Sequence, residues 1–188
     1  MTTFLLLKNH LIAVSYTHLG VYGVGKTTLC DILSEKYLIS SYSSSELISK
    51  CNHEEYGKNK YVTNSNRNQE ILVNQVNKIK DESFILNGHF CLKEKNNKVI
   101  LLENEVFKKL NLSCILLLSA SVEIIKENLF KRDKIYYDEE YIKLLLKCEE
   151  EQAEKVSNLY KIPLLKYNMQ FNNNDAKNVI ELLKHIGG

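Results

Sequence analysis

The sequence predicts a three-layer α/β fold in which helices cover both faces of a five-stranded parallel sheet. Two observations predict this fold. Short apolar runs alternate along the chain with stretches whose apolar residues recur at helical spacing. The first helical stretch also follows a glycine-rich loop, from Gly20 to Thr27, which is the arrangement of a strand, a phosphate-binding loop and a helix. Right-handed connections between parallel strands then place helices on both faces of the sheet.

The composition is that of one globular domain. The chain has 188 residues, of which 44% are hydrophobic and 26% are charged. A net charge of +2 gives no reason to expect a nucleic-acid partner. The five cysteines are scattered without paired spacing, which indicates reduced thiols in a cytoplasmic protein. The apolar runs near the N-terminus are too short to span a membrane, so no membrane partner is expected. The oligomeric state is not specified by the sequence.

The glycine-rich loop reads G-x-x-x-x-G-K-T between Gly20 and Thr27. Glycines allow backbone N–H groups to turn inward around a polyphosphate, while the lysine reaches the β- and γ-oxygens and the threonine hydroxyl ligates Mg²⁺. The helix that begins near Lys26 directs its positive end at the same anion. The residues expected to bind ATP are Gly20, Gly23, Val24, Gly25, Lys26, Thr27 and Thr28.

The elements of the first half follow from apolar spacing and from capping residues. A strand that enters the loop should be apolar up to Gly20, but the apolar run at 11–15 is followed by the less regular residues 16–19. Ser43 to Glu46 offer an N-cap for a helix. The elements expected after the loop are a helix over 26–37, a strand over 37–42, a helix from 43–46 onward, a polar loop over 52–63 and a helix over 64–80.

The second half repeats the alternation. Continuous apolar runs indicate buried parallel strands, and Ser119 to Ser121 cap the helix that follows one of them. The expected elements are a strand over 83–86, a hairpin of 90–94 and 98–102, a helix over 103–110, a strand over 113–118, helices over 122–131 and 138–159, a strand over 163–167 and a helix over 175–186. Ligands of such sheets bind outside the carboxyl ends of the strands, where the glycine-rich loop lies.

Three segments together resemble the P-loop nucleotide kinases, and in particular the archaeal-type adenylate kinases. These are the loop Gly20–Thr28, the strand end Asn87-Gly88-His89-Phe90 and Lys131-Arg132-Asp133 after a helix. The resemblance runs from Gly20 to the C-terminus. It implies a P-loop NTPase fold of the nucleotide-kinase type, with ATP and Mg²⁺ as cofactors. It also implies transfer of the γ-phosphoryl group to a small acceptor, a nucleoside monophosphate, within a single domain that has a lid near 131–138 and acceptor-side helices near 43–80.

The resemblance implies roles for individual residues. Lys26, expected in a solvated loop, and the lid residue Arg132 would be catalytic. Only Arg67 and Arg132 are arginines among 25 basic residues, and the guanidinium fork grips phosphate better than an ammonium group. Thr27 and Asn87 would lie at the metal, although the related kinases carry Asp at the position of Asn87. The residues expected to contact the acceptor are Ser44, Arg67, Gln69 and His89.

Plainer interpretations stand beside these roles. Arg132 could pair with Asp133 at a solvated helix end, and His89 could be a core histidine. Tyr136 and Tyr137 could stack on adenine or pack the loop, and the run Glu149–Glu151 is expected on an exposed helix face. A regulatory ATP-binding module without an acceptor is the alternative function. A GTPase is less well supported because no N-K-x-D sequence follows a strand.

Overall fold

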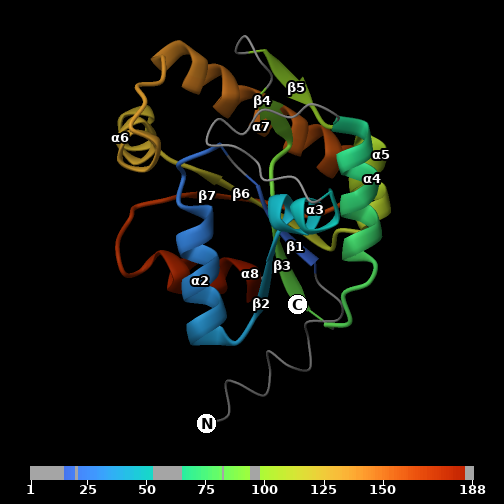
Figure 1. Ribbon diagram of the computed structural model, residues 1–188. Helices are drawn as coiled ribbons and strands as arrows, with labels where there is room; N and C mark the ends of the chain where they lie inside the picture. The colour runs from blue at the N-terminus through green and yellow to red at the C-terminus, as the bar shows by residue number, and fades with distance from the viewer. Residues whose placement is uncertain (1–14, 20, 53–64, 82, 94–97, 185–188) are drawn as a thin grey trace.

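A computed structural model of the chain describes residues 15–19, 21–52, 65–81, 83–93 and 98–184 (Figure 1). Within these residues, five parallel strands form one sheet in the order β2-β3-β1-β6-β7. The strands are β1 (Ser15–Leu19), β2 (Ser40–Ser43), β3 (Phe84–Asn87), β6 (Cys114–Ser119) and β7 (Leu164–Asn168). The strand that enters the glycine-rich loop is therefore central, with β3 on one side and β6 on the other.

The strand that enters the glycine-rich loop contains the less regular residues 16–19. Within the described part of the chain it spans Ser15–Leu19, and residues 11–14 of the apolar run lie outside that part. The sequence SYTHL forms the strand because pairing in a parallel ladder uses backbone groups, and β1 pairs with both neighbours. A strand that ends at Leu19 also leads directly into Gly20, as the loop requires.

Apart from α4 (Ser65–Val76), the helices lie within two residues of the expected bounds where both are defined. They are α2 (Lys26–Tyr37), α3 (Ser44–Asn52), α4 (Ser65–Val76), α5 (Asn104–Leu110), α6 (Val122–Asp133), α7 (Glu139–Tyr160) and α8 (Asp175–Lys184), and α4 ends four residues before the expected 80. Two short antiparallel strands, β4 (Cys91–Lys93) and β5 (Val99–Leu101), form the expected hairpin. The polar loop expected over 52–63 lies almost entirely outside the described residues. Among the described helices, none is long and apolar enough to cross a membrane.

The apolar core is divided by the sheet into two layers. In β6, Leu116 and Leu118 pack into one cluster with α2 and α8, while Ile115 and Leu117 pack into the other with α4 and α5. This alternation is what a strand buried on both faces produces. The long helix α7 reaches both clusters, through Ile142 near its start and Val156 near its end. Helices therefore cover both faces, and the polar residues that follow the strands meet at one edge.

Candidate active site

The glycine-rich loop joins β1 to α2 and adopts a backbone that favours glycine. Gly23 has a φ of 87° and Gly25, the residue before α2, also has a φ of 87°. Side chains other than glycine are strained in this left-handed region. A Cβ atom at Gly23 would also lie 3.1 Å from Cγ of Leu129 and 3.2 Å from the backbone oxygen of Ile125. The loop is thus packed closely against α6. Gly20 lies outside the described residues.

Two side chains donate hydrogen bonds to backbone oxygens of the loop. Nδ2 of Asn128, on α6, donates to the backbone oxygen of Gly23 at 2.9 Å. Nζ of Lys26 donates to the backbone oxygen of Val21 at 3.0 Å. Lys26 is only 8% exposed, which corrects the expectation of a solvated lysine. The burial follows from this hydrogen bond, which folds the side chain back over its own loop, where its ammonium group also lies 5.9 Å from the centre of the Tyr22 ring.

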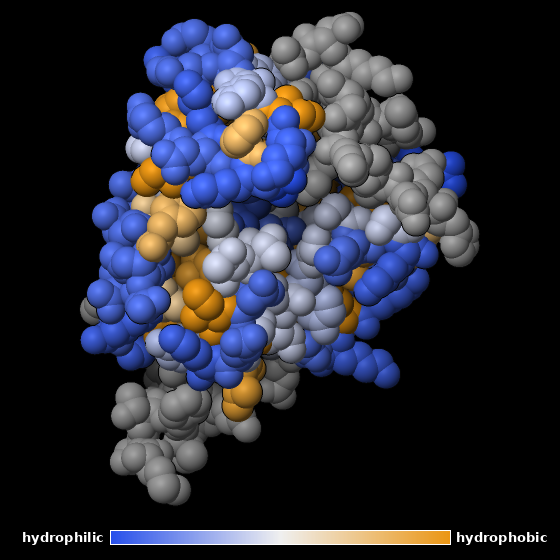
Figure 2. All heavy atoms as spheres, turned by 60° about the vertical axis from the view of Figure 1, so that its left-hand side comes forward, coloured by the Kyte–Doolittle hydropathy of each residue, from blue (hydrophilic) through white to orange (hydrophobic). Residues whose placement is uncertain are grey.

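A cavity of about 1030 Å³ extends from the glycine-rich loop to α3, α4 and α5. Figure 2 shows a hollow near the centre of one face, bordered mainly by hydrophilic and neutral residues. The expected site residues that line the cavity are Gly23, Gly25, Lys26, Thr27, Thr28, Ser44, Gln69, Asn87, His89 and Arg132. Two others do not line it: Val24 is buried in the core, and Arg67 is exposed on α4.

Thr27 and Asn87, the two residues expected at a metal ion, both line this cavity. Thr27 is exposed at the start of α2, and Asn87 ends β3, in register with Ser43 of β2. Magnesium in phosphoryl-transfer sites is held largely by phosphates and water, with one or two protein oxygens. A hydroxyl and an amide oxygen fit that need. Within the described part of the chain, no group of three or more His, Cys, Asp and Glu side chains could hold a metal ion.

The far half of the cavity combines buried amides with an apolar wall. Asn68 and Gln69, on α4, are both buried, and Nε2 of Gln69 donates to Oγ of Ser65 at 2.7 Å. Asn68 was not anticipated as a site residue, although its place beside Gln69 in an apolar-spaced helix could have indicated it. The apolar wall is formed by Leu72, Leu92, Leu102, Val106, Phe107 and Leu110.

Arg132 lines the cavity, but its guanidinium group is hydrogen-bonded to the adjacent Asp133. Its Nε and one terminal nitrogen donate to the two carboxylate oxygens of Asp133 at 2.6 and 2.5 Å. The Asp133 carboxylate raises the pKa of Arg132. The expected loop position is wrong, because α6 continues to Asp133 and Arg132 sits in its last turn. Tyr137 donates to Asp133 at 3.2 Å and therefore packs the loop, while Tyr136 stacks on Phe130 with ring centres 4.4 Å apart.

Glu149 corrects the expectation of an exposed acidic run. It is 1% exposed, and its Oε2 accepts the backbone N–H of Phe90 at 2.9 Å. Its Oε1 lies 3.2 Å from Nδ1 of His89. Helical spacing could have indicated this burial, because Glu149 falls on the same face of α7 as Leu145 and Gln152. Glu150 and Glu151 remain exposed, as expected.

The chain was compared with known families and structures. The model of the AAA domain family matches residues 19–143, more than half of the chain. A comparison with curated protein sequences gives no match. Similar solved structures include a gluconokinase from Sinorhizobium meliloti 1021, with a TM-score of 0.61, 12% identity and 94% coverage of each chain. A shikimate kinase from Bacteroides thetaiotaomicron has a TM-score of 0.55 and 14% identity. The match covers 92% of this chain and 97% of the shikimate kinase chain.

A third similar structure is a shikimate kinase from Acinetobacter baumannii in complex with shikimate, with a TM-score of 0.60, 15% identity and 94% coverage of each chain. At sequence identities this low, the comparison concerns the fold alone. The three similar structures confirm the α/β fold of the P-loop kinase type, and they do not single out the adenylate kinases that the sequence resembles.

Proposed function

This chain belongs to the AAA domain family, and we propose that it is an ATP-dependent kinase that transfers the γ-phosphoryl group to a small acceptor. The observation that carries the proposal is the extent of the cavity. One continuous space is lined by the glycine-rich loop on one side and by α3, α4 and α5 on the other. A protein that only binds ATP needs the first half of this space, whereas transfer requires room for both substrates.

The residues of the loop fit ATP. The left-handed backbone at Gly23 and Gly25 supports the curvature that directs N–H groups toward a phosphate. Lys26 would exchange its hydrogen bond to the Val21 carbonyl for phosphate oxygens, and Thr28 would hydrogen-bond the α-phosphate. Mg²⁺ would be held near Thr27 and Asn87, where it neutralises charge on the phosphates. Arg132 and the loop after α6 would form the lid of a single domain.

A nucleoside monophosphate is the acceptor that the sequence resemblance favours. The apolar wall, which includes Leu92 and Phe107, suits the face of a base. The amides of Asn68 and Gln69 offer the donor and acceptor groups that read its edge. Lys50, at the cavity, would supply charge for the acceptor phosphate, since Arg67 does not line it.

A hydroxyl-bearing metabolite is the second candidate, because a histidine lines the middle of the cavity. His89 is held by a buried carboxylate, an arrangement that suits removal of a proton from a hydroxyl. A phosphate oxygen is already ionised and needs no such group. Gluconate and shikimate, the hydroxyl compounds in the names of the similar structures, belong to this class.

A panel assay tests the proposal. ADP formation from Mg-ATP would be measured with nucleoside monophosphates, nucleosides, gluconate and shikimate as acceptors, and with no acceptor. We expect one acceptor class to raise the rate well above the rate of ATP hydrolysis, and the Lys26→Ala variant to abolish the increase. ATP binding without transfer to any acceptor would instead support the regulatory module, which the neutral Asn87 favours.

A further inference from the structure

Glu149 is a buried carboxylate that contacts His89, Phe90 and Cys91. It is 1% exposed in the middle of α7, and both carboxylate oxygens are engaged by the segment that follows β3. A buried carboxylate is costly unless it is fully hydrogen-bonded. Its neighbours differ: Glu150 and Glu151 are exposed and pair with Lys166 and Lys147. Glu149 therefore contacts residues on the cavity side of α7, and not residues at the exposed surface of this helix.

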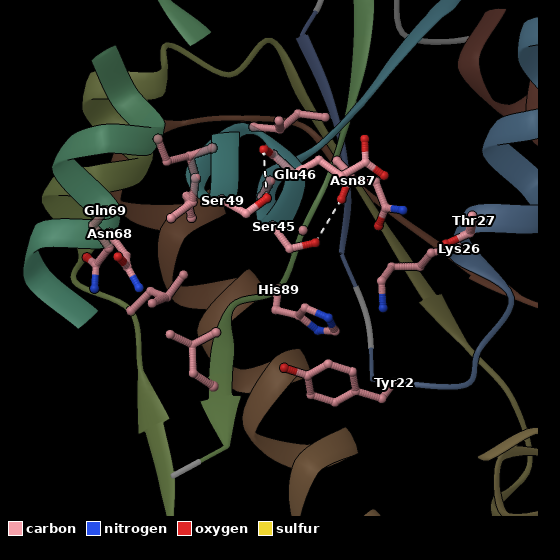
Figure 3. A pocket seen from close by; sticks show the side chains of 18 of the residues that line it. Tyr22, Lys26, Thr27, Ser45, Glu46, Ser49, Asn68, Gln69, Asn87 and His89 are labelled. Carbon is pink, nitrogen blue, oxygen red and sulfur yellow. Dashed lines mark hydrogen bonds between the residues drawn. The ribbon is translucent and has the colours of Figure 1, made fainter. Parts of the chain in front are cut away.

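His89 connects this carboxylate to the cavity. Its ring centre lies 4.1 Å from that of Tyr22 in the glycine-rich loop, with the two ring planes tilted by 33°, so the ring lies beside the expected phosphate site. Figure 3 shows the His89 ring pointing toward Lys26 and lying next to the Tyr22 ring. The side chain of His89 is 17% exposed and lines the cavity. A histidine so placed lies between the ATP half and the acceptor half.

The contact with Glu149 determines which ring nitrogen carries the hydrogen. Nδ1 of His89 lies 3.2 Å from Oε1 of Glu149. With Glu149 ionised, the carboxylate can only accept hydrogen bonds, and Nδ1 would then be the donor. In a neutral imidazole the other nitrogen, Nε2, is then a hydrogen-bond acceptor. The N–H of Phe90 on the second oxygen fixes the direction of the carboxylate. The orientation and the tautomer of His89 are thus set by one side chain.

We propose that Glu149 is a positioning residue, which holds His89 so that Nε2 takes the proton of a hydroxyl acceptor. The proposal rests on the kinase function and selects the hydroxyl class of acceptor within it. As the acceptor oxygen bonds to the γ-phosphorus of ATP, the bond from that phosphorus to the bridging oxygen breaks. The electron pair leaves on ADP, and the hydroxyl proton moves to Nε2. The resulting imidazolium is stabilised by the Glu149 carboxylate through Nδ1.

The test replaces Glu149 by glutamine. In Glu149→Gln, the amide oxygen can still accept the N–H of Phe90, but its NH₂ group faces Nδ1 of His89 and favours the opposite tautomer. NMR of isotope-labelled histidine in the free protein reports the tautomer, and the His89 signals are those that His89→Gln removes. We expect hydrogen on Nδ1 in the parent and on Nε2 in Glu149→Gln. The matched control is Glu150→Gln, an exposed neighbour that should leave the His89 signals unchanged.

Kinetics provide the second readout. For the acceptor found in the panel, we expect Glu149→Gln to lower kcat about 10²–10⁴-fold, with the acceptor KM within several-fold of the parent. In the His89→Gln background the same change should have no further effect, because Glu149 acts through His89. Thermal unfolding of Glu149→Gln checks that the fold is retained.

Four results would overturn the proposal in different ways. Hydrogen on Nε2 in the parent would refute the tautomer without any activity measurement. Unchanged kcat in Glu149→Gln, with an active parent and a switched tautomer, would refute the positioning role. Transfer to nucleoside monophosphates alone would refute the hydroxyl step while leaving the kinase function intact. A parent that transfers to no acceptor would refute the kinase function itself, and the positioning role with it.

Discussion

Lys26→Ala separates the structural role of this lysine from its role in phosphoryl transfer. The side chain is buried and its ammonium group donates to the Val21 carbonyl at 3.0 Å. A hydrogen bond to a charged group contributes about 1.5–3 kcal/mol. The Val21 oxygen also accepts the N–H of Val24 at 3.4 Å, so alanine leaves it one weak partner. We therefore expect the free energy of unfolding to fall by about 1–2 kcal/mol, which is around and below the lower end of that range.

The assay combines unfolding with turnover. For a chain of this length, about 1–2 kcal/mol corresponds to a Tm decrease of about 2–8 °C. Loss of the charge at the transferring phosphoryl group should lower the rate of ADP formation by at least about 10²–10³-fold. The control is Lys26→Met, which keeps the apolar stem but not the charge, and which should lose the same turnover. Turnover near that of the parent in folded Lys26→Ala would refute the kinase function, and an unchanged Tm would refute the contribution of the Val21 hydrogen bond.

Substitutions at three further positions test the residues around the site. Asn128→Ala removes the hydrogen bond to Gly23 and should weaken ATP binding about 2–10-fold, as an ATP titration would measure, since one such bond contributes about 0.5–1.5 kcal/mol. Asn87→Asp should raise turnover at limiting Mg²⁺, and an unchanged Mg²⁺ titration would place Asn87 away from the metal. Arg132→Ala should lower the single-turnover rate far more than ATP affinity, with only partial rescue in Arg132→Lys because an ammonium group lacks the guanidinium fork. Equal rates for the parent and Arg132→Ala would show that Arg132 does not act on the phosphates.

The sequence predicted the features that depend on local patterns. The spacing of the glycines could be recognised because the loop backbone has a positive φ at Gly23 and Gly25, which favours glycine. Apolar spacing located the helices, since a helix that covers a sheet needs one continuous apolar face. The strand β1 was not recognised at residues 16–19 because its sequence, SYTHL, is not the continuous apolar run that marks the other central strands.

The features that were missed depend on contacts between distant segments. Glu149 lies 60 residues from His89 in the sequence, and Asn128 lies 105 residues from Gly23. No local pattern shows that such residues meet. An acidic run on a helix is usually exposed, and only the apolar neighbours of Glu149 on the same face of α7 distinguish it. Lys26 was expected in solvent because a glycine-rich loop by itself does not show that its lysine folds back onto Val21.

The helix α6 links the glycine-rich loop to the candidate lid. Ile125 and Leu129 approach Gly23, Asn128 donates to it, and Arg132 lines the cavity. These four residues are spaced three, four and seven positions apart, so they share one face of the helix. One face of α6 therefore both contacts the glycine-rich loop and places Arg132 at the cavity. Arg132 already lines the cavity, and for the proposed contact with a phosphate, that phosphate would have to replace the Asp133 carboxylate on the guanidinium fork.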